Sequence, residues 1–289
     1  MFVSAFMVFA ALAIAIVAAR AGRERISGQG QPVAEGAAPD AAERPAPADE
    51  RKPAIKPDRD SRGTLVFVID DAGHNTGQLD AFLDFPGPLT IAVLPGLQYS
   101  AEAAARARDA GKEVILHQPM EAVGGQDPGP AAVTLYMPED DVRSLIRANL
   151  AGIGGAVGMN NHMGSAVTAD ERLMTIILDE ARAAGVYYLD SLTSGESVVH
   201  SVASRLNLPC WERAVFLDNS PDRASIVAYI NEGLKVAEKR GYAVMIGHVW
   251  SAELAQTLSD LYPGLLEQGF SLSTISRIMM DKDDEDTGY

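Results

Sequence analysis

The sequence predicts an α/β fold: a (β/α) barrel of seven or eight units, each a parallel strand followed by a helix. Two observations carry this prediction. Short apolar runs alternate with longer amphipathic stretches along most of the chain, and polar residues end many of the runs. Continuous apolar strands that alternate with helices indicate a parallel sheet covered on both faces. A doubly wound sheet has the same rhythm, but the chain lacks the glycine-rich fingerprint of dinucleotide-binding sheets, which favours the barrel.

The apolar runs mark the expected strands, and the stretches between them mark the expected helices. The runs are 65–69, 89–94, 113–117, 155–160, 186–190, 214–218, 243–248 and 271–276. The helical stretches include 99–111, 138–152 and 168–185. Thr168 and Glu171 form a capping box, which predicts that the third of these helices begins there. Each of the three stretches ends on a glycine, the residue that most often terminates helices.

Composition divides the chain into four segments. Residues 1–25 contain an uncharged apolar stretch, Phe2–Ala19, and are expected to form a membrane anchor or a signal segment. Residues 26–63 are rich in proline and alanine without apolar periodicity, which is typical of a disordered linker. The folded barrel domain is expected over residues 64–280. Residues 281–289 then form an acidic tail.

The overall composition limits the classes of partner. The formal net charge is −15, and the sequence has no basic stripe. Because a nucleic acid needs such a stripe to neutralise its phosphates, we expect no nucleic-acid partner. The single cysteine, Cys210, excludes an internal disulfide, and no metal-ligand spacing surrounds it. A buried structural cysteine is the simpler interpretation. Composition does not predict the oligomeric state.

Polar side chains follow or end most of the predicted strands. These residues are Asp70, Asp71, His117, His162, Asp190, Asp218 and His248. The carboxyl ends of parallel strands lie at one end of a barrel, where active sites are built. The sequence therefore predicts that these side chains surround a single pocket.

The residue types around this pocket indicate a divalent metal. The adjacent carboxylates of Asp70 and Asp71 repel each other unless a cation lies beside them. One aspartate and two histidines, here His117 and His162, form an ordinary site for zinc with one position open for water. The other aspartate is then free to act as a base. A phosphatase of the Asp-x-Asp class is the competing interpretation, but contiguous strand residues are expected to point apart.

A series of short motifs links the chain to a known family. In sequence order they read FVIDDAG, EVILHQPME, GMNNHMGSAVT, YYLDSLTS, RAVFLDN and IGHV. From about Leu65 to Met279, the chain resembles the divergent polysaccharide deacetylases of bacterial envelopes. The resemblance implies a distorted (β/α) barrel of about seven strands, of the glycoside hydrolase/deacetylase type. It also implies removal of acetyl groups from amino sugars with a bound divalent metal, zinc being the expected ion.

The same resemblance implies roles for individual residues. Asp70 corresponds to the general base and His248 to the histidine that protonates the leaving amine. Asp190 is similar to the aspartate that orients or tunes a catalytic histidine. The implied metal ligands are Asp71, His117 and His162.

Three further residues are candidate substrate contacts. Asn160 and Asn161 either orient His162 or bind sugar hydroxyls, and Trp250 is expected to stack on a sugar ring. Asp218 and Asn219 end a predicted strand and are candidates for the same two roles, orienting His162 or binding sugar hydroxyls.

The chain departs from the wider superfamily at two positions. Glu121 lies four residues after His117, where the superfamily has its second metal-binding histidine, so that His162 must come from another strand. Val249 follows His248 where proline is usual. The expected function is nevertheless metal-dependent deacetylation of an envelope carbohydrate. The alternative is a catalytically inactive sugar-binding or envelope-scaffold protein that keeps the barrel.

The location of the barrel relative to the membrane follows less directly. Arg20, Arg23 and Arg25 come after the apolar stretch, and the positive-inside rule would keep them cytoplasmic. A flexible tether after an anchor, however, suits an enzyme that acts on a polymer just outside the membrane. We therefore expect a membrane-anchored protein with its barrel on the periplasmic side, or secretion into the periplasm.

Overall fold

The computed structural model of the protein describes residues 61–279. The predicted anchor or signal segment, most of the predicted linker and the acidic tail lie outside these residues. Within them, no helix combines the length and the apolar character that crossing a membrane requires.

The described residues form a nine-stranded sheet in which every paired strand is parallel to its neighbour. The strands are β1 (Gly63–Ala72), β2 (Thr90–Val93), β3 (Glu113–Met120), β4 (Gly158–Met163), β5 (Tyr187–Asp190), β6 (Cys210–Glu212), β7 (Val215–Phe216), β8 (Tyr242–His248) and β9 (Phe270–Ser273). Their order is β6-β5-β4-β3-β2-β1-β8-β7, with β9 also paired to β1.

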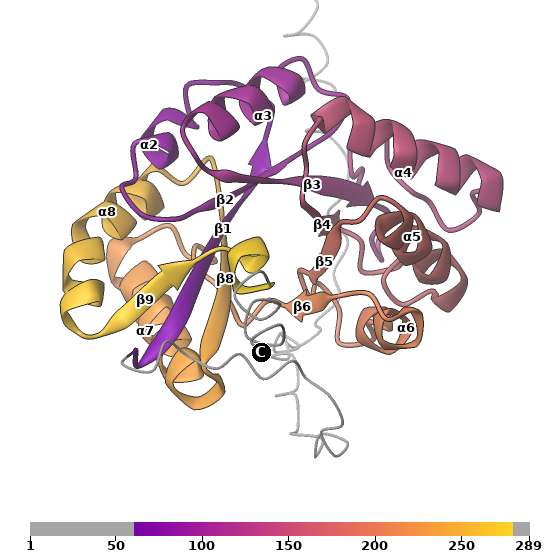
Figure 1. Ribbon diagram of the computed structural model, residues 1–289. Helices are drawn as coiled ribbons and strands as arrows, with labels where there is room; N and C mark the ends of the chain where they lie inside the picture. Colours follow the sequence, from indigo (N-terminus) through magenta and orange to yellow (C-terminus); the bar gives the residue numbers. More distant parts are fainter. Residues whose placement is uncertain (1–60, 280–289) are drawn as a thin grey trace, which may run out of the picture. The chain divides into compact units, whose positions relative to one another are not determined.

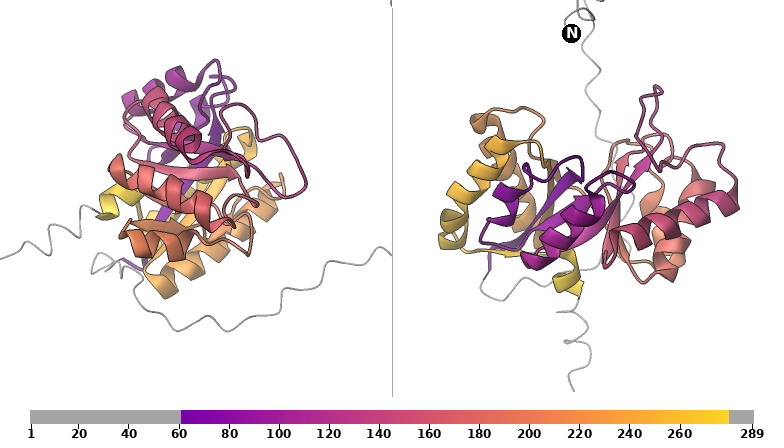
Figure 2. Two further views of the ribbon diagram at one scale, coloured as in Figure 1. Left: turned by 90° about the vertical axis from the view of Figure 1, so that its right-hand side faces the viewer. Right: turned by 90° about the horizontal axis from the view of Figure 1, so that it is seen from above.

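Helices connect most of these strands. They are α2 (Asp80–Leu83), α3 (Ser100–Asp109), α4 (Glu139–Ile153), α5 (Glu171–Ala183), α6 (Val199–Leu206), α7 (Arg223–Arg240) and α8 (Ala252–Glu267). The strands curl into an incompletely closed barrel, and the helices cover its outer side (Figure 1, Figure 2). The predicted distorted (β/α) barrel is therefore confirmed. Five strands, β2, β5, β6, β7 and β9, have four residues or fewer; β6 lies outside every apolar run that the sequence showed.

The distortion of the barrel is concentrated where β6 meets β7. These two strands are the ends of the sheet order and are joined by two residues, Arg213 and Ala214. The backbone N–H of Arg213 donates to the carbonyl of Asp190 at 2.9 Å, and that of Ala214 donates to the carbonyl of Val244 at 2.7 Å. Strands β6 and β7 do not pair with each other, which leaves a gap in the barrel. The two residues between them cross this gap from the β5 side to the β8 side.

Alternate residues of the strands enter two separate apolar cores. On β1, Leu65 and Phe67 pack in the core between sheet and helices. Val66 and Val68 pack in the barrel interior. Because all four are buried, the strand reads as a continuous apolar run in the sequence. The alternation assigns each later residue of the strand to one face or the other.

The C-terminal segment closes the amino ends of the strands. The predicted strand 271–276 ends at Ser273, and residues 275–279 are helical. Ile275 and Ile278 are buried in the interior core. At the same end, Glu113 at the start of β3 accepts a hydrogen bond from the backbone N–H of Ser276. The other end of the barrel, at the strands' carboxyl ends, is therefore the one available for a site.

The ends of two helices differ from the sequence prediction. Helix α5 begins at Glu171 with Asp170 as its cap, whose carboxylate accepts from the N–H of Leu173 at 2.9 Å. Thr168, the predicted cap, instead donates to the carbonyl of Gly164. Helix α4 runs one residue past Gly152, to Ile153.

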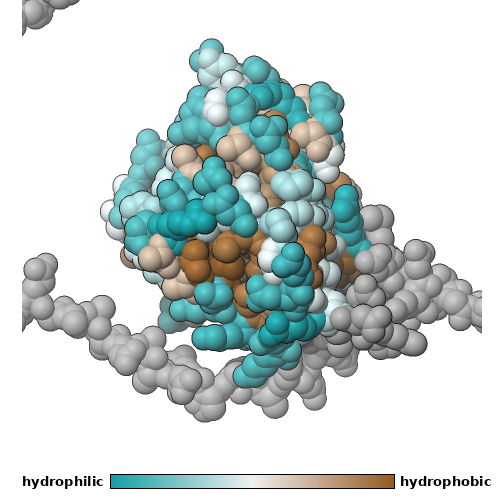
Figure 3. Space-filling view, turned by 90° about the vertical axis from the view of Figure 1, so that its left-hand side faces the viewer, coloured by the Kyte–Doolittle hydropathy of each residue, from teal (hydrophilic) through white to brown (hydrophobic). Residues whose placement is uncertain are grey.

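Large apolar side chains are exposed at several places on the described surface. On the side shown in Figure 3, hydrophobic residues form a band bordered by hydrophilic ones. The large apolar side chains with the highest exposure come from different segments; they are Val123, Tyr136, Val157, Trp250 and Leu266. Among these, the aromatic ring of Trp250 directly follows β8 and borders the strand ends considered next.

Candidate metal and catalytic site

Strand alternation directs the predicted site residues into the barrel. Asp70 follows Val66 and Val68 on the inward face of β1, and His117 shares its face of β3 with inward-facing Ile115. Asp70 is 2% exposed and His117 is 2% exposed. Both side chains therefore lie at the carboxyl end of the barrel, directly above the apolar interior.

Asp71 reaches the same site because the strand is irregular there. The pairing of β1 with β2 shifts register between Ile69 and Ala72, and Asp71 has a φ of 67°. Its carboxylate Oδ1 lies 3.2 Å from His117 Nε2 and 3.0 Å from His162 Nδ1. The expectation that adjacent aspartate side chains point apart is therefore wrong, since a left-handed residue breaks the alternation.

The three predicted metal ligands converge on one point. Ligand atoms of Asp71, His117 and His162 all lie within 4.8 Å of one another. The nearest ring nitrogens of the two histidines are 3.2 Å apart. Asp71 Oδ1 is buried, and among the described residues these two imidazoles are the side chains in reach of it. A buried carboxylate oxygen that faces two ring nitrogens and no other donor is the arrangement that a bound cation satisfies.

Asn160 determines which nitrogen of His117 faces this point. Its amide Nδ2 donates to Asp70 Oδ1 at 2.9 Å, so its Oδ1 is the atom that lies 2.8 Å from His117 Nδ1. His117 Nδ1 must therefore carry a proton. In the neutral ring, Nε2 then presents a lone pair toward Asp71, as a metal ligand requires. The residues present thus fit a zinc-like ion.

The pKa values of the two adjacent aspartates are shifted in opposite directions. Burial raises the pKa of Asp70, although nearby His117 and His248 oppose this effect. Burial also acts to raise the pKa of Asp71, but contacts with His117 and His162 outweigh it and hold that pKa well below its usual range. Asp71 is therefore the firmly ionised member of the pair, and Asp70 is the better proton acceptor.

His248 lies across the site in a pair with Asp218. It ends β8, opposite Asp70 in the β1–β8 register. Its Nδ1 lies 2.9 Å from Asp218 Oδ1, and its backbone N–H donates to Asp218 Oδ2 at 2.8 Å. Burial acts to lower the pKa of His248, but the hydrogen bond and charge of Asp218 raise it overall. The pair therefore favours a protonated imidazole, which is the form of a general acid.

Two aromatic rings pack against the imidazole of His248. Phe216 stacks at a centroid distance of 5.9 Å and Trp250 at 5.0 Å, both within 20° of parallel. Trp250 remains 50% exposed. The guanidinium of Arg213 lies 3.8 Å from the centre of the Phe216 ring. His248 is thus held by packing as well as by Asp218, while Trp250 presents ring surface to solvent.

Asp190 does not contact either group of histidines. On β5, Tyr187 and Leu189 face the interior, so Asp190 faces the helices. Its carboxylate accepts from the hydroxyl of Ser197 at 2.6 Å and from the N–H of Leu192 at 2.9 Å. The assignment of Asp190 to a catalytic histidine is therefore wrong. Asp218 makes that contact; it lies two residues after Phe216, the last residue of β7, whose side chain packs against the interior core.

The two asparagines predicted to touch substrate are buried instead. Asn160 is 0% exposed and Asn161 is 1% exposed. Asn161 donates to the carbonyl of Met163 at 2.8 Å and accepts from the N–H of Ser191 at 3.0 Å. Because their amide groups are engaged within the protein, a role in binding sugar hydroxyls is contradicted. Both residues position the strand ends, and Asn160 also holds His117 and Asp70.

Glu121 takes a structural role at the position of the absent second histidine. Its carboxylate accepts from the N–H of Leu135 at 2.8 Å, which anchors the long segment between β3 and α4. Ser165 anchors the same segment by accepting from the N–H of Val123 at 2.9 Å. His162, on the neighbouring strand β4, therefore completes the ligand set from a different position in the chain.

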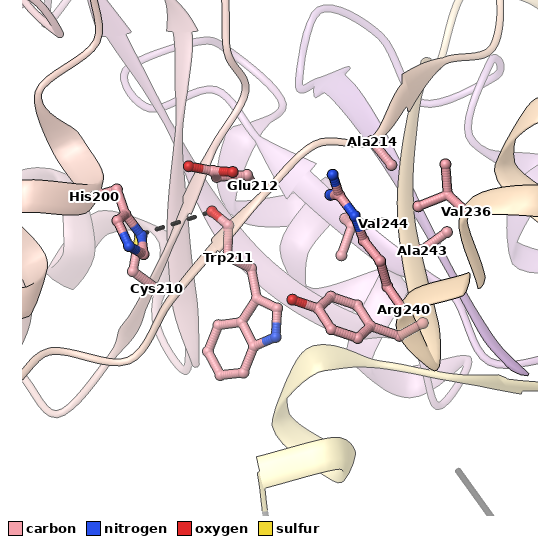
Figure 4. Close-up of a pocket in the computed structure, with 10 residues that line it drawn as sticks. His200, Cys210, Trp211, Glu212, Ala214, Val236, Arg240, Ala243 and Val244 are labelled. Atoms are coloured by element: carbon pink, nitrogen blue, oxygen red, sulfur yellow. Dashed lines mark hydrogen bonds between the residues drawn. The ribbon is translucent and has the colours of Figure 1, made fainter. Parts of the chain in front are cut away.

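Two pockets lie at different places on the barrel. One, of about 140 Å³, borders His162 at the carboxyl ends of the strands. The other lies beside the β6–β7 gap and is lined by residues such as Trp211 and Arg240 (Figure 4). There the Cys210 thiol donates to the carbonyl of Trp211 at 3.7 Å, and desolvation together with the nearby carboxylates of Asp190 and Glu212 raises the pKa of that thiol well above its usual value. No proposed ligand or acid–base residue lines this second pocket.

Two curated bacterial proteins are similar to this chain in sequence. The chain is 32% identical over 206 residues to the protein YibQ of Escherichia coli (strain K12), described as uncharacterized; the match covers 70% of this chain and 65% of that one. It is 30% identical over 188 residues to an uncharacterized protein of Haemophilus influenzae (strain Rd), covering 65% and 67% respectively. The matched region thus spans about two thirds of the length of these curated relatives.

Solved structures share the fold at lower identity. The uncharacterized protein ATU2773 from Agrobacterium tumefaciens C58 superposes with a TM-score of 0.70 at 19% identity, over 76% of this chain and 93% of that one. The Xyl-CE4 domain of a multidomain xylanase from the hindgut metagenome of Trinervitermes trinervoides gives 0.50 at 13% identity, over 76% and 91%. These similarities concern the fold.

The family model of the divergent polysaccharide deacetylases matches residues 67–279, which include every proposed ligand and acid–base residue of the site. That match covers most of the chain, from β1 to the C-terminal helical turn, and so the protein belongs to the divergent polysaccharide deacetylase family.

Proposed function

We propose that the protein is a metal-dependent hydrolase that removes acetyl groups from a carbohydrate of the bacterial envelope. One observation carries the proposal. The ligand atoms of Asp71, His117 and His162 converge, with Asp70 beside them and the His248–Asp218 pair across the site. This combination provides a place for a cation, a base and an acid around one space, which is what hydrolysis of an amide requires.

The roles of the chain's residues follow from their environments. Asp71, His117 and His162 would hold zinc, which supplies Lewis acidity to a carbonyl group. Asp70 accepts the proton of the attacking water, since its carboxylate lies beside the ligands and its pKa is raised by burial. His248 donates a proton to the departing amine, which otherwise leaves as a poor anionic group. Trp250 offers a ring face to the sugar next to that amine.

Asp218 and Asn160 hold these groups in position. Asp218 fixes the His248 ring and favours its charged form. Asn160 fixes the ring of His117 and donates to Asp70, so a single amide holds both a ligand and the base. Such support reduces the reorganisation needed during the reaction.

Two measurements on the purified protein test this function. After incubation with zinc and removal of the excess, elemental analysis is expected to find close to one equivalent of metal. The same preparation is expected to release acetate from at least one member of a panel of N- and O-acetylated glycans, and a chelator should abolish the release. A protein that binds glycans but takes up no zinc and releases no acetate would be the inactive sugar-binding alternative.

We further propose that the barrel lies on the periplasmic side of the membrane. Support comes from the sequence, in which an apolar stretch and a proline- and alanine-rich segment precede the barrel. An alkaline phosphatase fusion after residue 62 tests this placement, because that reporter folds where disulfides form. Enzymatic activity of the reporter is expected. A stable but inactive fusion would place the barrel in the cytoplasm.

A further inference from the structure

The pocket beside His162 is apolar and belongs to loops that the acid–base residues do not use. Its cavity is about 140 Å³, and its walls include Leu94, Pro95, Leu97, Pro119 and Pro130. Leu94, Pro95 and Pro119 are buried, and Leu97 is half-buried. His74 and Asp127 also line the pocket, and like Pro130 they are exposed. Proline and leucine walls bind apolar groups and offer few hydrogen bonds to a sugar ring.

Most of the pocket lies on the side of β1 away from His248. The pocket is lined by His74 in the segment after β1, by the segment after β2, by β3 and its following segment, and by His162 of β4. His248 ends β8, which pairs with β1 on the edge that faces away from β2. Along the curled sheet, β1 with Asp70 and Asp71 therefore lies between His248 and the pocket walls that come from β3, β4 and the segment after β2.

This arrangement orients the scissile bond. In an N-acyl sugar the nitrogen carries the sugar, and His248 is the group that protonates this nitrogen. Exposed Trp250 stacks on His248, so an aromatic face for the sugar lies on the same side. The acyl chain is attached to the other side of the carbonyl carbon. With the nitrogen directed toward β8, the acyl chain is directed toward His162 and the apolar pocket.

The size of the pocket exceeds what an acetyl methyl group fills. An apolar cavity of about 150 Å³ is large enough to bind benzene, which has six heavy atoms. A single methyl group would leave most of the 140 Å³ pocket unoccupied. Filling the remainder with further methylenes is favourable, at roughly a fourfold gain in affinity for each one buried.

We propose that this pocket binds the acyl part of the substrate and that the protein accepts, in addition to acetyl, acyl chains of about four to six carbons. The inference rests on the proposed hydrolysis and specifies its substrate class. Water adds to the carbonyl carbon, the C–N bond breaks, and the amine leaves with a proton. The products are a free carboxylate, whose chain occupies the pocket, and an amino sugar.

A binding series tests the pocket independently of turnover. Acetate, butyrate and hexanoate are titrated into the zinc-supplied protein by calorimetry. Affinity is expected to rise roughly fourfold per methylene up to hexanoate. In a protein with labelled leucine methyl groups, hexanoate should shift the NMR signals of Leu94 and Leu97, whereas acetate should not. Equal affinities across the series and unshifted leucine signals would overturn the proposal.

A substitution that fills the pocket provides the matched test. Leu97→Trp is expected to raise the ratio of acetyl to hexanoyl turnover on N-acyl glucosamines at least tenfold and to remove the chain-length dependence of carboxylate binding. The control is Leu266→Trp, at an exposed leucine on α8, which should change neither measurement. If Leu97→Trp does not fold, Leu97→Ala is expected to shift the preference toward longer chains.

The combined outcomes separate the two proposals. Acetyl turnover with a flat carboxylate series would keep the hydrolase and overturn the acyl pocket. A rising series without turnover of any substrate would keep the binding pocket and overturn the hydrolase. A flat series without turnover would overturn both.

Discussion

Asn160 shows how one buried residue prepares both halves of the site. Its amide contacts His117 Nδ1 at 2.8 Å and Asp70 Oδ1 at 2.9 Å, and its side chain is fully buried. An amide has one acceptor and one donor group, so it can satisfy a ring N–H and a carboxylate at once. A histidine or a carboxylate at the same position could not make both contacts with a neutral His117 and an ionised Asp70.

Replacing Asn160 should therefore weaken metal binding as well as folding. Asn160→Ala leaves His117 Nδ1 and Asp70 Oδ1 buried without their partner. We expect zinc affinity to fall by about 10- to 100-fold and the free energy of unfolding to fall by about 1–3 kcal/mol. Competition with a chromogenic chelator measures the affinity, and urea unfolding measures the stability. Unchanged zinc affinity in a folded variant would contradict the positioning role.

Replacing each of the two adjacent aspartates should affect metal binding and turnover differently. Asp71→Ala and His162→Ala each remove a ligand, so both variants are expected to lose most of the bound metal. Asp70→Asn removes the proton acceptor but no ligand, so it should keep the metal and lose turnover by about 10²- to 10⁴-fold. Elemental analysis and acetate release provide the comparison. An Asp70→Asn protein as empty of metal as Asp71→Ala would reverse these roles.

The pair of His248 and Asp218 predicts a change in pH dependence. Asp218 raises the pKa of His248, so the protonated acid persists to higher pH. In Asp218→Asn this pKa should fall, and activity should be lost at a lower pH on the alkaline side of the profile. The profile of kcat against pH measures the shift. Asp190→Asn serves as the control, because Asp190 bonds to Ser197 and lies on the helix-facing side of β5.

At the level of elements, helices α4 and α5 are joined by a cluster of ion pairs. Glu180 on α5 is 4% exposed at its side chain and accepts from Arg147 and Arg143 of α4, at 2.7 and 2.9 Å. A hydrogen bond from Arg147 lowers the pKa of Glu180, and Arg143 adds to this effect against the opposing influence of burial. The packing of these two helices over the sheet thus includes a charge that must stay paired.

This cluster predicts an acid-sensitive contribution to stability. The folded pKa of Glu180 lies below its unfolded value, so the stabilisation is complete above the unfolded pKa and is lost as pH falls through the folded pKa. Glu180→Gln should lower the free energy of unfolding by about 1 kcal/mol at pH 7, since Arg147 is exposed and screened. At pH 3 the difference from the parent protein should shrink. Urea unfolding at both pH values provides the measurement, and an equal difference would count against the pairing.

At the level of the whole molecule, the barrel is closed at one end and available at the other. The C-terminal helical turn fills the amino ends of the strands, where Ile275 is fully buried in the interior core. The site residues Asp70 and His248 lie at the opposite ends of their strands. Closing one end lets the interior remain apolar beneath the charged site.

This architecture predicts that the plug supports folding without forming the site. Ile275→Ala removes buried methylenes and should lower the free energy of unfolding by about 2–4 kcal/mol, while the folded protein keeps its metal. Leu266→Ala, at an exposed position of α8, should cost less than about 1 kcal/mol. Thermal unfolding with elemental analysis of the folded fraction tests both. Loss of metal from folded Ile275→Ala would show that the two ends are coupled.

The sequence by itself determined the class of fold and most of the site. Alternating apolar runs and helical stretches are local patterns. They were sufficient to predict the barrel and to place the polar residues at the strand ends. The short strand β6 and the helical turn at 275–279 were missed, because burial by distant segments rather than local pattern maintains them.

Only the tertiary structure decided which face of each strand a residue occupies. When both faces of a strand are buried, inward and outward positions are equally apolar, so the sequence carries no sign of the alternation. For this reason Asp190 and Asp218 were indistinguishable as strand-end aspartates, although the first faces the helices and the second faces His248. The bulge that turns Asp71 toward the histidines was equally hidden, because it depends on how β1 pairs with β2.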